Sequence, residues 1–517
     1  MSVSVRRAIV VAVLVGLVVS CWPVPVGQVD AAPKLQLPGH GIPPKAKPHR
    51  RSGGESFPPL PLPATPLRRS ERKREPSPPA LVTKLAYAKV KFAVQDGRRV
   101  SKTEWLNVTD DVRNLLKWTN RELGIRYRHF DSNWRSFSYD PTEMPILYLT
   151  GHDPMPTLSS EQRAKLHRFV MDGGTVFANA CCGAKEFTES FRREMAALFP
   201  KRELAPLASD HPVFSAYYDV KKVQYQQGTK KRFTNVPYLE GMNVGCRTAV
   251  FFSPIDLANG WYGQNPPTNF EPGTWIVGAD ARRLGSNMVT YAIACYEYGR
   301  MRAIEKVFHE KGEATRDELV LAQVVHSGDW DPTPSALPNL LKFMQDNTTL
   351  QTKYKREVVA LGQVDVFKHP MLYMTGLRDF KLNEAEVSRL RSYLESGGVL
   401  VADAAAGRRS FDIAFRREIQ RVLPKGELSI LPVEHPIYSA VFPVRQVAYT
   451  ALVKQESPDL RVPALEGITR DGSLCVIYSR FSLGNGWEQL PFAYNRGYAD
   501  ADSLKLGVNV FVYGMTH

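Results

Sequence analysis

The chain contains one long internal repeat, and this repeat limits its fold more than any other feature. Residues 145–195 recur as residues 370–419. Nine of the 21 positions in residues 174–194 are identical to those in residues 398–418, without gaps. Further matched segments follow in the same order, at an offset of 222 to 226 residues. A period this long predicts two copies of a whole domain rather than a solenoid of short repeats.

Within each copy, patterns typical of strands alternate with patterns typical of helices. We expect a strand over residues 86–94, and a helix that begins with the capping pair Ser159 and Gln162. Residues 174–180 and 398–404 are near-continuous apolar runs, as expected for strands that helices cover on both faces. The sequence therefore predicts α/β domains with three layers and a mostly parallel sheet.

Composition separates the folded domains from a basic leader. The 517 residues carry a net charge of +15, but residues 1–80 hold 12 Lys and Arg against 4 Asp and Glu. Residues 32–80 are rich in Pro and lack apolar periodicity, so we predict a disordered basic linker there. This linker either attracts an anionic surface polymer or an envelope protein, or is a solvated spacer. No aromatic residues alternate with its basic ones, which argues against nucleic acid as its partner.

The first 31 residues resemble an export signal. Arg6 and Arg7 precede an apolar run over residues 8–20, which is too short for a comfortable membrane span. Cleavage before Ala32 predicts a soluble exported protein, whereas Cys21 follows a lipobox-like sequence and could be lipidated. An uncleaved signal is a second route to membrane anchoring. We expect an exported protein, either periplasmic or anchored on the extracytoplasmic side.

Two folded domains follow the leader. We predict copy one over residues 81–300, a linker over residues 301–318, and copy two over residues 319–517. Mean hydropathy is −0.27, which argues against a protein with many membrane spans. Six cysteines in a chain of this length do not form a disulfide framework.

Ligands of parallel α/β sheets bind where the strands end at their carboxyl side. Two such ends in copy one carry residues that can do chemistry. The predicted candidates there are Gly151, His152, Asp153, Cys181, Cys182 and Gly183. No phosphate-binding loop or dinucleotide-binding glycine pattern occurs, and we predict no cofactor.

Six ordered segments resemble a known family. They read LYLTGH, GGTVFANACCG, FRREM, DHPVFSAYY, FFSPIDLANGW and LGSNMVTYA. Together they resemble the bacterial domain-of-unknown-function family 4159, which is placed among class I glutamine-amidotransferase-like folds. The resemblance covers residues 86–300 and, more weakly, residues 318–517. It implies flavodoxin-like sheets and an extracytoplasmic bacterial setting, and it implies no particular reaction.

Amidotransferases of this fold hold their nucleophilic cysteine at the turn where Cys181 and Cys182 lie. A helix N-terminus stabilises a thiolate, and a nucleophile also needs a base, for which His152 and His211 with its neighbour Asp210 are candidates. Backbone N–H groups of Gly183 and Ala184 are candidate oxyanion donors. The sequence lacks a Gly-x-Cys-x-Gly elbow, which puts glutamine hydrolysis in doubt.

Three other interpretations of this turn stay open. Small residues there could let the helix pack close to the sheet, the turn could bind a ligand without chemistry, or the thiols could form a strained vicinal disulfide. Neighbouring cysteines chelate one zinc ion awkwardly, so we predict no metal.

Copy two has lost the thiol candidates. Ala405 and Ala406 replace the cysteine pair, and Leu377 replaces His152, whereas His435 matches His211. A histidine kept without the thiols predicts a local role, such as fixing a His-Pro turn. The sequence favours an exported two-domain binding or scaffold protein. The alternative is a Cys-dependent hydrolase or transferase whose site lies in copy one.

Overall fold

The computed structural model describes residues 79–87, 91–95, 97–102, 105, 108, 110–227, 231–262, 273–302, 321–350 and 356–517. Both copies lie in one compact unit that spans Ala80–His517. The predicted signal peptide, Cys21 and nearly all of the predicted linker over residues 32–80 lie outside the described residues. Most of the predicted linker over residues 301–318 also lies outside them.

Copy one is built on a seven-stranded sheet in the order β4-β1-β5-β6-β11-β10-β7. Its strands are β1 (Ala80–Ala86), β4 (Arg128–Asn133), β5 (Ile146–Gly151), β6 (Thr175–Ala180), β7 (Ala205–Pro206), β10 (Glu240–Val244) and β11 (Arg247–Ser253). The five strands from β4 to β11 pair in parallel, and β10 and β7 extend the sheet in antiparallel fashion. The carboxyl ends of β5, β6 and β11 therefore lie side by side at one edge of the sheet.

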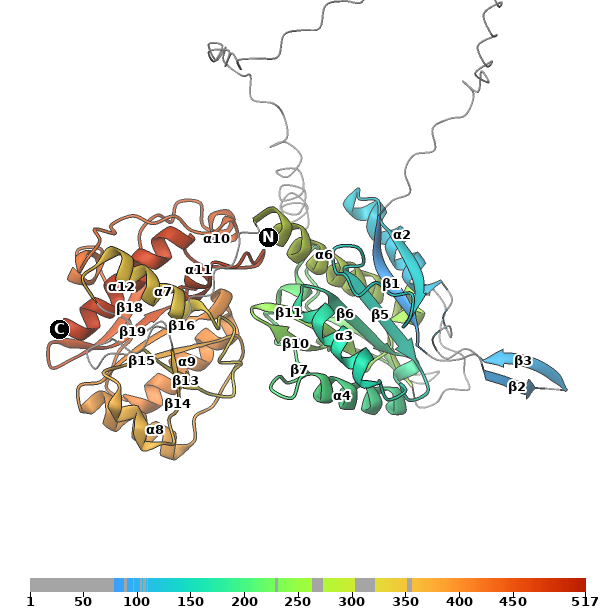
Figure 1. Ribbon diagram of the computed structural model, residues 1–517, viewed down its shortest axis with the longest axis horizontal. Coiled ribbons are helices and arrows are strands. Elements are labelled where there is room, and N and C mark those ends of the chain that lie inside the picture. The colour runs from blue at the N-terminus through green and yellow to red at the C-terminus, as the bar shows by residue number, and fades with distance from the viewer. Residues whose placement is uncertain are drawn as a thin grey trace, which may run out of the picture. The chain divides into compact units, whose positions relative to one another are not determined.

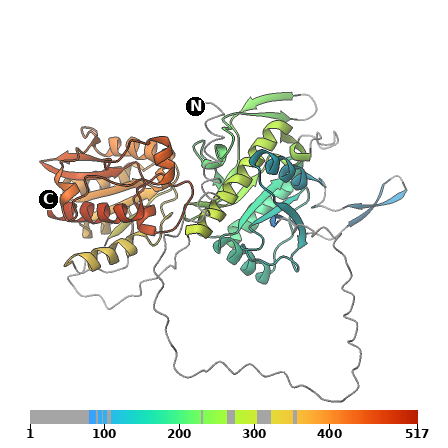
Figure 2. The ribbon, with the colours of Figure 1, turned by 90° about the horizontal axis from the view of Figure 1, so that it is seen from above.

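Helices cover both faces of this sheet, which confirms the predicted α/β architecture (Figure 1). The helices are α2 (Asp111–Leu123), α3 (Ser160–Met171), α4 (Lys185–Leu198), α5 (Ala258–Tyr262) and α6 (Gly278–Arg302). One apolar core lies between the sheet and α2, α5 and α6, and the other lies between the sheet and α3 and α4. Ser159 and Gln162 form the predicted capping box at the start of α3. Figure 2 shows α6 as the longest helix of this copy.

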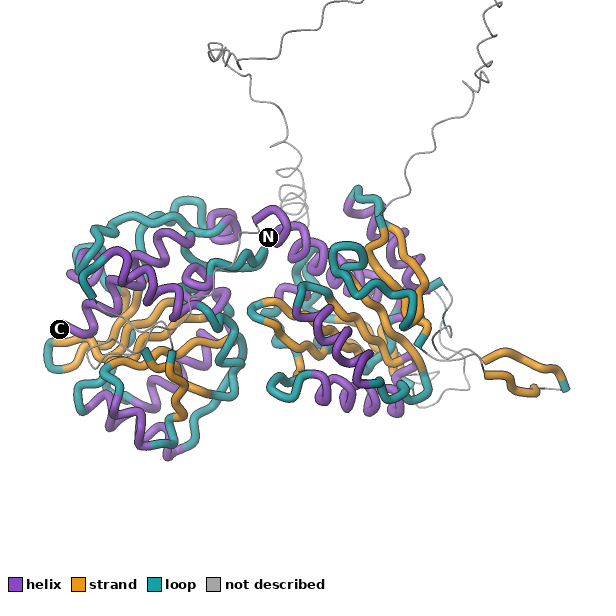
Figure 3. Tube along the Cα trace, viewed as in Figure 1, coloured by secondary structure: helices purple, strands orange, loops and turns teal. Residues whose placement is uncertain are grey.

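The segment predicted as one strand over residues 86–94 contains parts of two strands. β1 ends at Ala86, and β2 (Lys91–Gln95) instead forms a two-stranded hairpin with β3 (Arg98–Lys102), seen at the edge of Figure 3. A strand in the middle of a parallel sheet needs a near-continuous apolar run. The segment Ala80–Ala86 takes this place: five of its seven residues are buried, although Thr83 and Lys84 are among them. A second small sheet joins β8 (Val223–Gln227), β9 (Lys231–Asn235) and β12 (Thr274–Ile276).

Copy two repeats the architecture in the order β14-β13-β15-β16-β19-β18-β17. Its strands are β13 (Ala322–Val325), β14 (Glu357–Ala360), β15 (Met371–Gly376), β16 (Val399–Ala404), β17 (Ser429–Ile430), β18 (Leu465–Arg470) and β19 (Ser473–Ser479). Its helices are α7 (Ala336–Asn347), α8 (Glu384–Glu395), α9 (Arg409–Val422), α10 (Ala451–Glu456), α11 (Gly484–Glu488) and α12 (Asp500–Thr516). The same two-core arrangement recurs, with α7, α11 and α12 on one face and α8 and α9 on the other.

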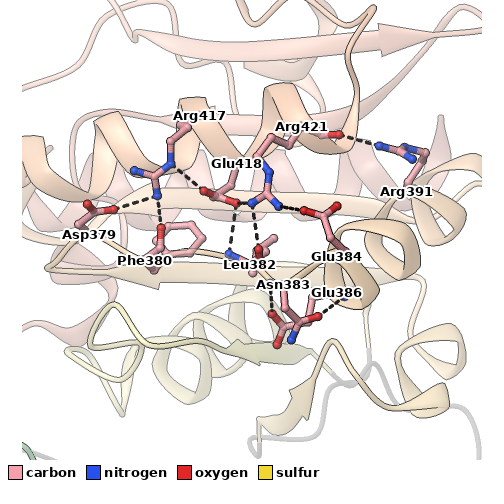
Figure 4. Close-up of polar contacts among 10 residues, drawn as sticks. All are labelled: Asp379, Phe380, Leu382, Asn383, Glu384, Glu386, Arg391, Arg417, Glu418 and Arg421. Atoms are coloured by element: carbon pink, nitrogen blue, oxygen red, sulfur yellow. Dashed lines mark hydrogen bonds and ion pairs between the residues drawn. The ribbon is translucent and has the colours of Figure 1, made fainter.

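The repeated motif FRRE has a structural role in both copies. In copy one, buried Glu194 accepts hydrogen bonds from Leu158 N–H (3.3 Å) and from the Arg163 guanidinium. In copy two, Glu418 accepts from Leu382 N–H (3.2 Å) and lies between two arginines of its own helix (Figure 4). Removing either glutamate would leave buried donors without partners, which explains why the motif recurs.

Candidate functional site

The two cysteines form a tight turn directly after a central strand. β6 ends at Ala180, and the short 3-10 segment η2 (Cys181–Gly183) leads into α4. Cys182 adopts a left-handed backbone (φ 55°, ψ 15°), which costs a residue with a Cβ about 1 kcal/mol or more. Ala406 in copy two has the same conformation (φ 51°). The strained turn is therefore a property of the fold, and the thiols are present only in copy one.

A buried carboxylate holds this turn from the neighbouring strand. Asp256 follows β11 and is fully buried, and its Oδ2 accepts a hydrogen bond from Cys182 N–H (2.7 Å). Its Oδ1 accepts from Asn179 Nδ2 (3.1 Å) and from Ala258 N–H (2.8 Å). Asp256 thus joins the ends of β6 and β11 and the start of α5.

Asn259, on α5, connects this carboxylate to the sulfur atoms. Its side-chain amide donates to Asp256 and lies 3.7 Å from Cys182 Sγ and 4.0 Å from Cys181 Sγ. The two sulfurs are 4.0 Å apart. A donor aimed at sulfur stabilises negative charge there, so the arrangement favours a thiolate.

His152 approaches the same sulfurs from the third strand. It follows β5, and one nitrogen of its imidazole and both sulfur atoms lie within 4.8 Å of one another. Cys181 and Cys182 are 1% and 5% exposed, whereas His152 is half-buried. The structure therefore brings together three of the predicted site residues, as the adjacency of parallel strand ends implies.

The environments of the two thiols differ. The hydrogen bond from the Cys181 thiol, reinforced by His152, lowers the pKa of Cys182 to about 6, although burial and the Asp256 charge oppose this. The same hydrogen bond raises the pKa of Cys181 well above its usual range, and burial adds to the effect. The opposite shifts assign the first ionisation of the pair to Cys182, with Cys181 as the donor to the charged sulfur.

A buried ion pair lies beside the cysteines, and sequence reasoning missed it. Lys84 on β1 donates to Asp111 Oδ1 (2.7 Å) and to the carbonyl of Val108 (2.6 Å). Tyr148 OH donates to the other oxygen of Asp111 (3.1 Å). Burial raises the pKa of Asp111 even though Lys84 pairs with it. Val108 in turn packs against both cysteines, so the ion pair anchors part of their apolar cover.

The structure does not bring His211 to the cysteines. Its Nε2 bonds Thr248 Oγ1 (2.8 Å) near the start of β11, while Asp256 follows the end of that strand. The five steps along the strand from Thr248 to Ser253 span roughly 16 Å. His211 Nδ1 accepts from Val213 N–H (3.1 Å), and burial lowers its pKa well below the usual range. His435 makes the same turn with Ile437 N–H (3.2 Å), which is the local role that its retention predicted.

The remaining predicted residues fall into different surroundings. Asp210 accepts hydrogen bonds from Ser410 of copy two and pairs with Arg408, which lowers the pKa of Asp210 although burial opposes its ionisation. Asp153 is half-buried beside His152. Ala184 N–H donates to the Cys181 carbonyl (3.2 Å), so it is not directed at a substrate.

Two glycines shape the site through their lack of a side chain. A Cβ on Gly151 would lie 1.7 Å from the Tyr87 hydroxyl, so this close approach requires glycine. Gly183 has a left-handed backbone (φ 72°), and a Cβ there would lie 3.3 Å from the carbonyl of Thr274. Both predicted glycines therefore act by permitting close packing around the turn.

Copy two keeps the turn of this site with rearranged partners and lacks its reactive groups. Ser482 stands at the position of Asp256. The buried carboxylate is Asp403, at the position of Asn179, and it accepts from Leu483 N–H (2.8 Å). Asn485 occupies the position of Asn259 and accepts from Ala406 N–H (2.8 Å). Its amide donates to Cys246 Sγ of copy one (3.2 Å). Cys246 of copy one therefore contacts Asn485, in the same way that Cys182 contacts Asn259 within copy one.

His152, Cys181 and Cys182 form the one cluster of candidate metal ligands in the described part of the chain. Imidazole nitrogen and thiolate sulfur are ligands that zinc accepts, but neighbouring cysteines chelate a single ion awkwardly, so the absence of a metal stays a prediction.

The protein is therefore an α/β protein with two tandem domains. One of the domains carries a pair of thiols at the carboxyl edge of its sheet. The family described as a domain of unknown function (DUF4159) matches residues 86–293 and 320–515. The chain belongs to this family and contains its domain twice, which confirms the predicted duplication. A search of curated proteins found no match. Among the described residues, no helix is both long and apolar enough to cross a membrane.

Proposed function

We propose that copy one is a thiol-dependent hydrolase or acyl transferase with Cys182 as its nucleophile and His152 as its acid and base. One observation carries this proposal: the sulfur and an imidazole nitrogen lie within 4.8 Å of each other at the adjacent ends of β6 and β5. The sequence favoured a binding or scaffold role, and this geometry supports the alternative. Nucleophile, base and orienting amide are the parts that covalent catalysis by cysteine requires.

Each residue of the site has a role in this reaction. The Cys182 thiolate attacks a carbonyl carbon, forming a C–S bond while the C=O electron pair moves to oxygen. The C=O bond then re-forms, the C–N or C–O bond of the substrate breaks, and His152 donates a proton to the leaving amine or alcohol. His152 next removes a proton from the water or acceptor, which attacks the thioester and releases the Cys182 thiolate as the C–S bond breaks. Asn259 and Asp256 hold the sulfur and the turn in position, and Gly183 N–H is the backbone donor we propose for the oxyanion.

We propose that the substrate is an amide or ester. A glutamine-specific site is not part of the proposal, because the Gly-x-Cys-x-Gly elbow is missing. Cys182 is only 5% exposed, so a narrow acyl group suits the site better than a bulky one.

We also propose that the protein is exported and held at the cell envelope through its basic leader. The charge pattern of residues 1–31 and the Pro-rich composition of residues 32–80 support this placement. Cell fractionation tests it, with Cys21→Ser as the matched variant. Loss of the membrane fraction in that variant supports lipidation, whereas recovery of the protein in the cytoplasm contradicts export.

A binding or scaffold role is a second candidate for copy two. The contact between Asn485 and Cys246 supports it, because copy two uses its remodelled site to hold a segment of copy one. We propose that copy two acts as a structural partner of the copy that carries the thiols.

The acyl-enzyme step can be tested with p-nitrophenyl acetate. We expect a burst of one p-nitrophenolate per chain, and an acetyl adduct of about 42 Da on the peptide that contains Cys182. Cys182→Ala reproduces Ala406, whose left-handed turn folds in copy two, so this variant keeps the backbone and loses the burst. Cys475→Ala removes a buried strand thiol and serves as the matched control. An unchanged burst in Cys182→Ala, or acetylation only at other residues, contradicts the proposed function.

A further inference from the structure

The proposed hydrolase needs one sulfur, yet the site contains two. Cys181 is 1% exposed, and the Sγ–Sγ distance to Cys182 is 4.0 Å. Asn259 directs its amide toward both sulfurs. A pair of thiols at this distance must approach by only about 2 Å to form a bond.

We propose that Cys181 and Cys182 also form a redox-active dithiol that reduces hydroperoxides and closes to a vicinal disulfide. This inference rests on the proposed function only in using the same Cys182 thiolate. It assigns Cys181 a role that acyl transfer leaves unexplained.

The first step oxidises Cys182. Its thiolate attacks one oxygen of the hydroperoxide, so that an S–O bond forms and the O–O bond breaks. The departing alkoxide or hydroxide takes a proton from His152 or from water and leaves as alcohol or water. Cys182 becomes a sulfenic acid, having given two electrons to the peroxide.

The second step consumes the neighbouring thiol. Cys181 sulfur attacks the sulfenic sulfur, an S–S bond forms and the S–O bond breaks. The hydroxide combines with the proton of the Cys181 thiol and leaves as water. In sum, two thiols and one hydroperoxide yield one disulfide, one alcohol and one water.

The other described cysteines provide contrast. Burial raises the pKa of Cys295 to about 12 and also raises the pKa of Cys246 and of Cys475, so all three remain neutral thiols. None of the three lies on a turn with a second cysteine. Oxidation by peroxide should therefore concentrate at Cys181 and Cys182, since susceptibility follows thiolate character.

The experiment treats the full chain with hydrogen peroxide, blocks remaining thiols with iodoacetamide and analyses the peptide that contains both cysteines. We expect a product about 2 Da lighter than the reduced peptide, unlabelled at both sulfurs and restored by dithiothreitol. Cys181→Ala, which places the copy-two residue there, should instead give a sulfenic acid that dimedone traps, followed by irreversible sulfinic acid. Cys295→Ala is the matched control and should behave as the unchanged chain.

The outcomes separate this inference from the proposed function. A sulfenic or sulfinic acid at Cys182 in the unchanged chain, with Cys181 still alkylated by iodoacetamide, overturns the dithiol and leaves the acyl reaction standing. If the disulfide forms readily but p-nitrophenyl acetate gives no acetyl adduct, the proposed hydrolase function is overturned and the proposal of a redox-active dithiol stands. A pair that stays unoxidised at peroxide concentrations that oxidise free cysteine overturns the inference outright.

Discussion

The lowered pKa of Cys182 predicts how the reaction rate of its thiol depends on pH. Substitution of the neighbouring Cys181 tests this prediction. The hydrogen bond from Cys181 is the largest single cause that lowers the pKa of Cys182 to about 6. Cys181→Ala removes this donor. The pKa of Cys182 should therefore rise, toward the ordinary thiol value of 9.0 as an upper limit.

The size of the effect follows from two opposing factors. At pH 6 about half of Cys182 is thiolate in the unchanged chain, against about one part in a thousand for a thiol of pKa 9. A thiolate of higher pKa is intrinsically more nucleophilic, by about 20-fold over three units. With the pKa of the variant at that upper limit, it should react about 25-fold more slowly at pH 6 and about 10-fold faster at pH 9, and a smaller rise in pKa reduces both factors. The two pH–rate profiles should cross between about pH 7 and 8.

Iodoacetamide labelling, measured on the Cys182 peptide by mass spectrometry, provides the assay. In the unchanged chain the rate should level off above about pH 7, because the thiol is then fully ionised. Cys295→Ala controls for the loss of a buried thiol elsewhere and should leave the profile unchanged. A rate that keeps rising to pH 9 in the unchanged chain, or two profiles that never cross, refutes the reasoning. Matching circular dichroism spectra establish that the variants are folded.

Two further predictions concern stability. Lys84→Met leaves the carboxylate of Asp111 buried without its partner and should lower the free energy of unfolding by about 3–5 kcal/mol in urea titrations. Adding Asp111→Asn to Lys84→Met should recover part of that loss. Equal stability of the single and the double variant would contradict the ion-pair argument. Thr248→Val removes the partner of His211 Nε2 and should cost about 1–3 kcal/mol. Because His211 lies away from the cysteines, Thr248→Val should not change how the iodoacetamide labelling rate of Cys182 depends on pH. A shift in the midpoint pH of that profile would contradict the separation of His211 from the cysteines.

Local patterns predicted the architecture because they report interactions close in sequence. The capping pair Ser159 and Gln162 forms as expected, since both partners lie within one turn of helix. The apolar run Thr175–Ala180 is a fully buried strand. The one strand predicted over residues 86–94 is instead parts of two, because alternation can mark an edge hairpin as well as a central strand.

The site was predicted only in part, because its polar residues come from distant segments. His152 could be placed beside Cys182 from the rule that strand ends meet at one edge. Asp256 and Asn259 were missed, since their link to β6 depends on β11 being its parallel neighbour, and no local pattern shows that pairing. A lysine within the otherwise apolar segment Ala80–Ala86 was a usable indication, because a buried lysine needs a charged partner.

The differences between the copies argue that the thiol site acts as one unit. A turn maintained only for packing would tolerate loss of one group at a time, because each small residue packs independently. In copy two, both sulfurs and the imidazole are replaced together, by Ala405, Ala406 and Leu377. The strained turn and the asparagine persist there, at Ala406 and Asn485, and Asn485 accepts the hydrogen bond from Ala406 N–H. Asp256, which holds the turn in copy one, is replaced by Ser482, and the buried carboxylate of copy two is Asp403, at the position of Asn179. Copy two therefore lacks the groups that the proposed chemistry uses, and it keeps the shape of the turn with rearranged partners.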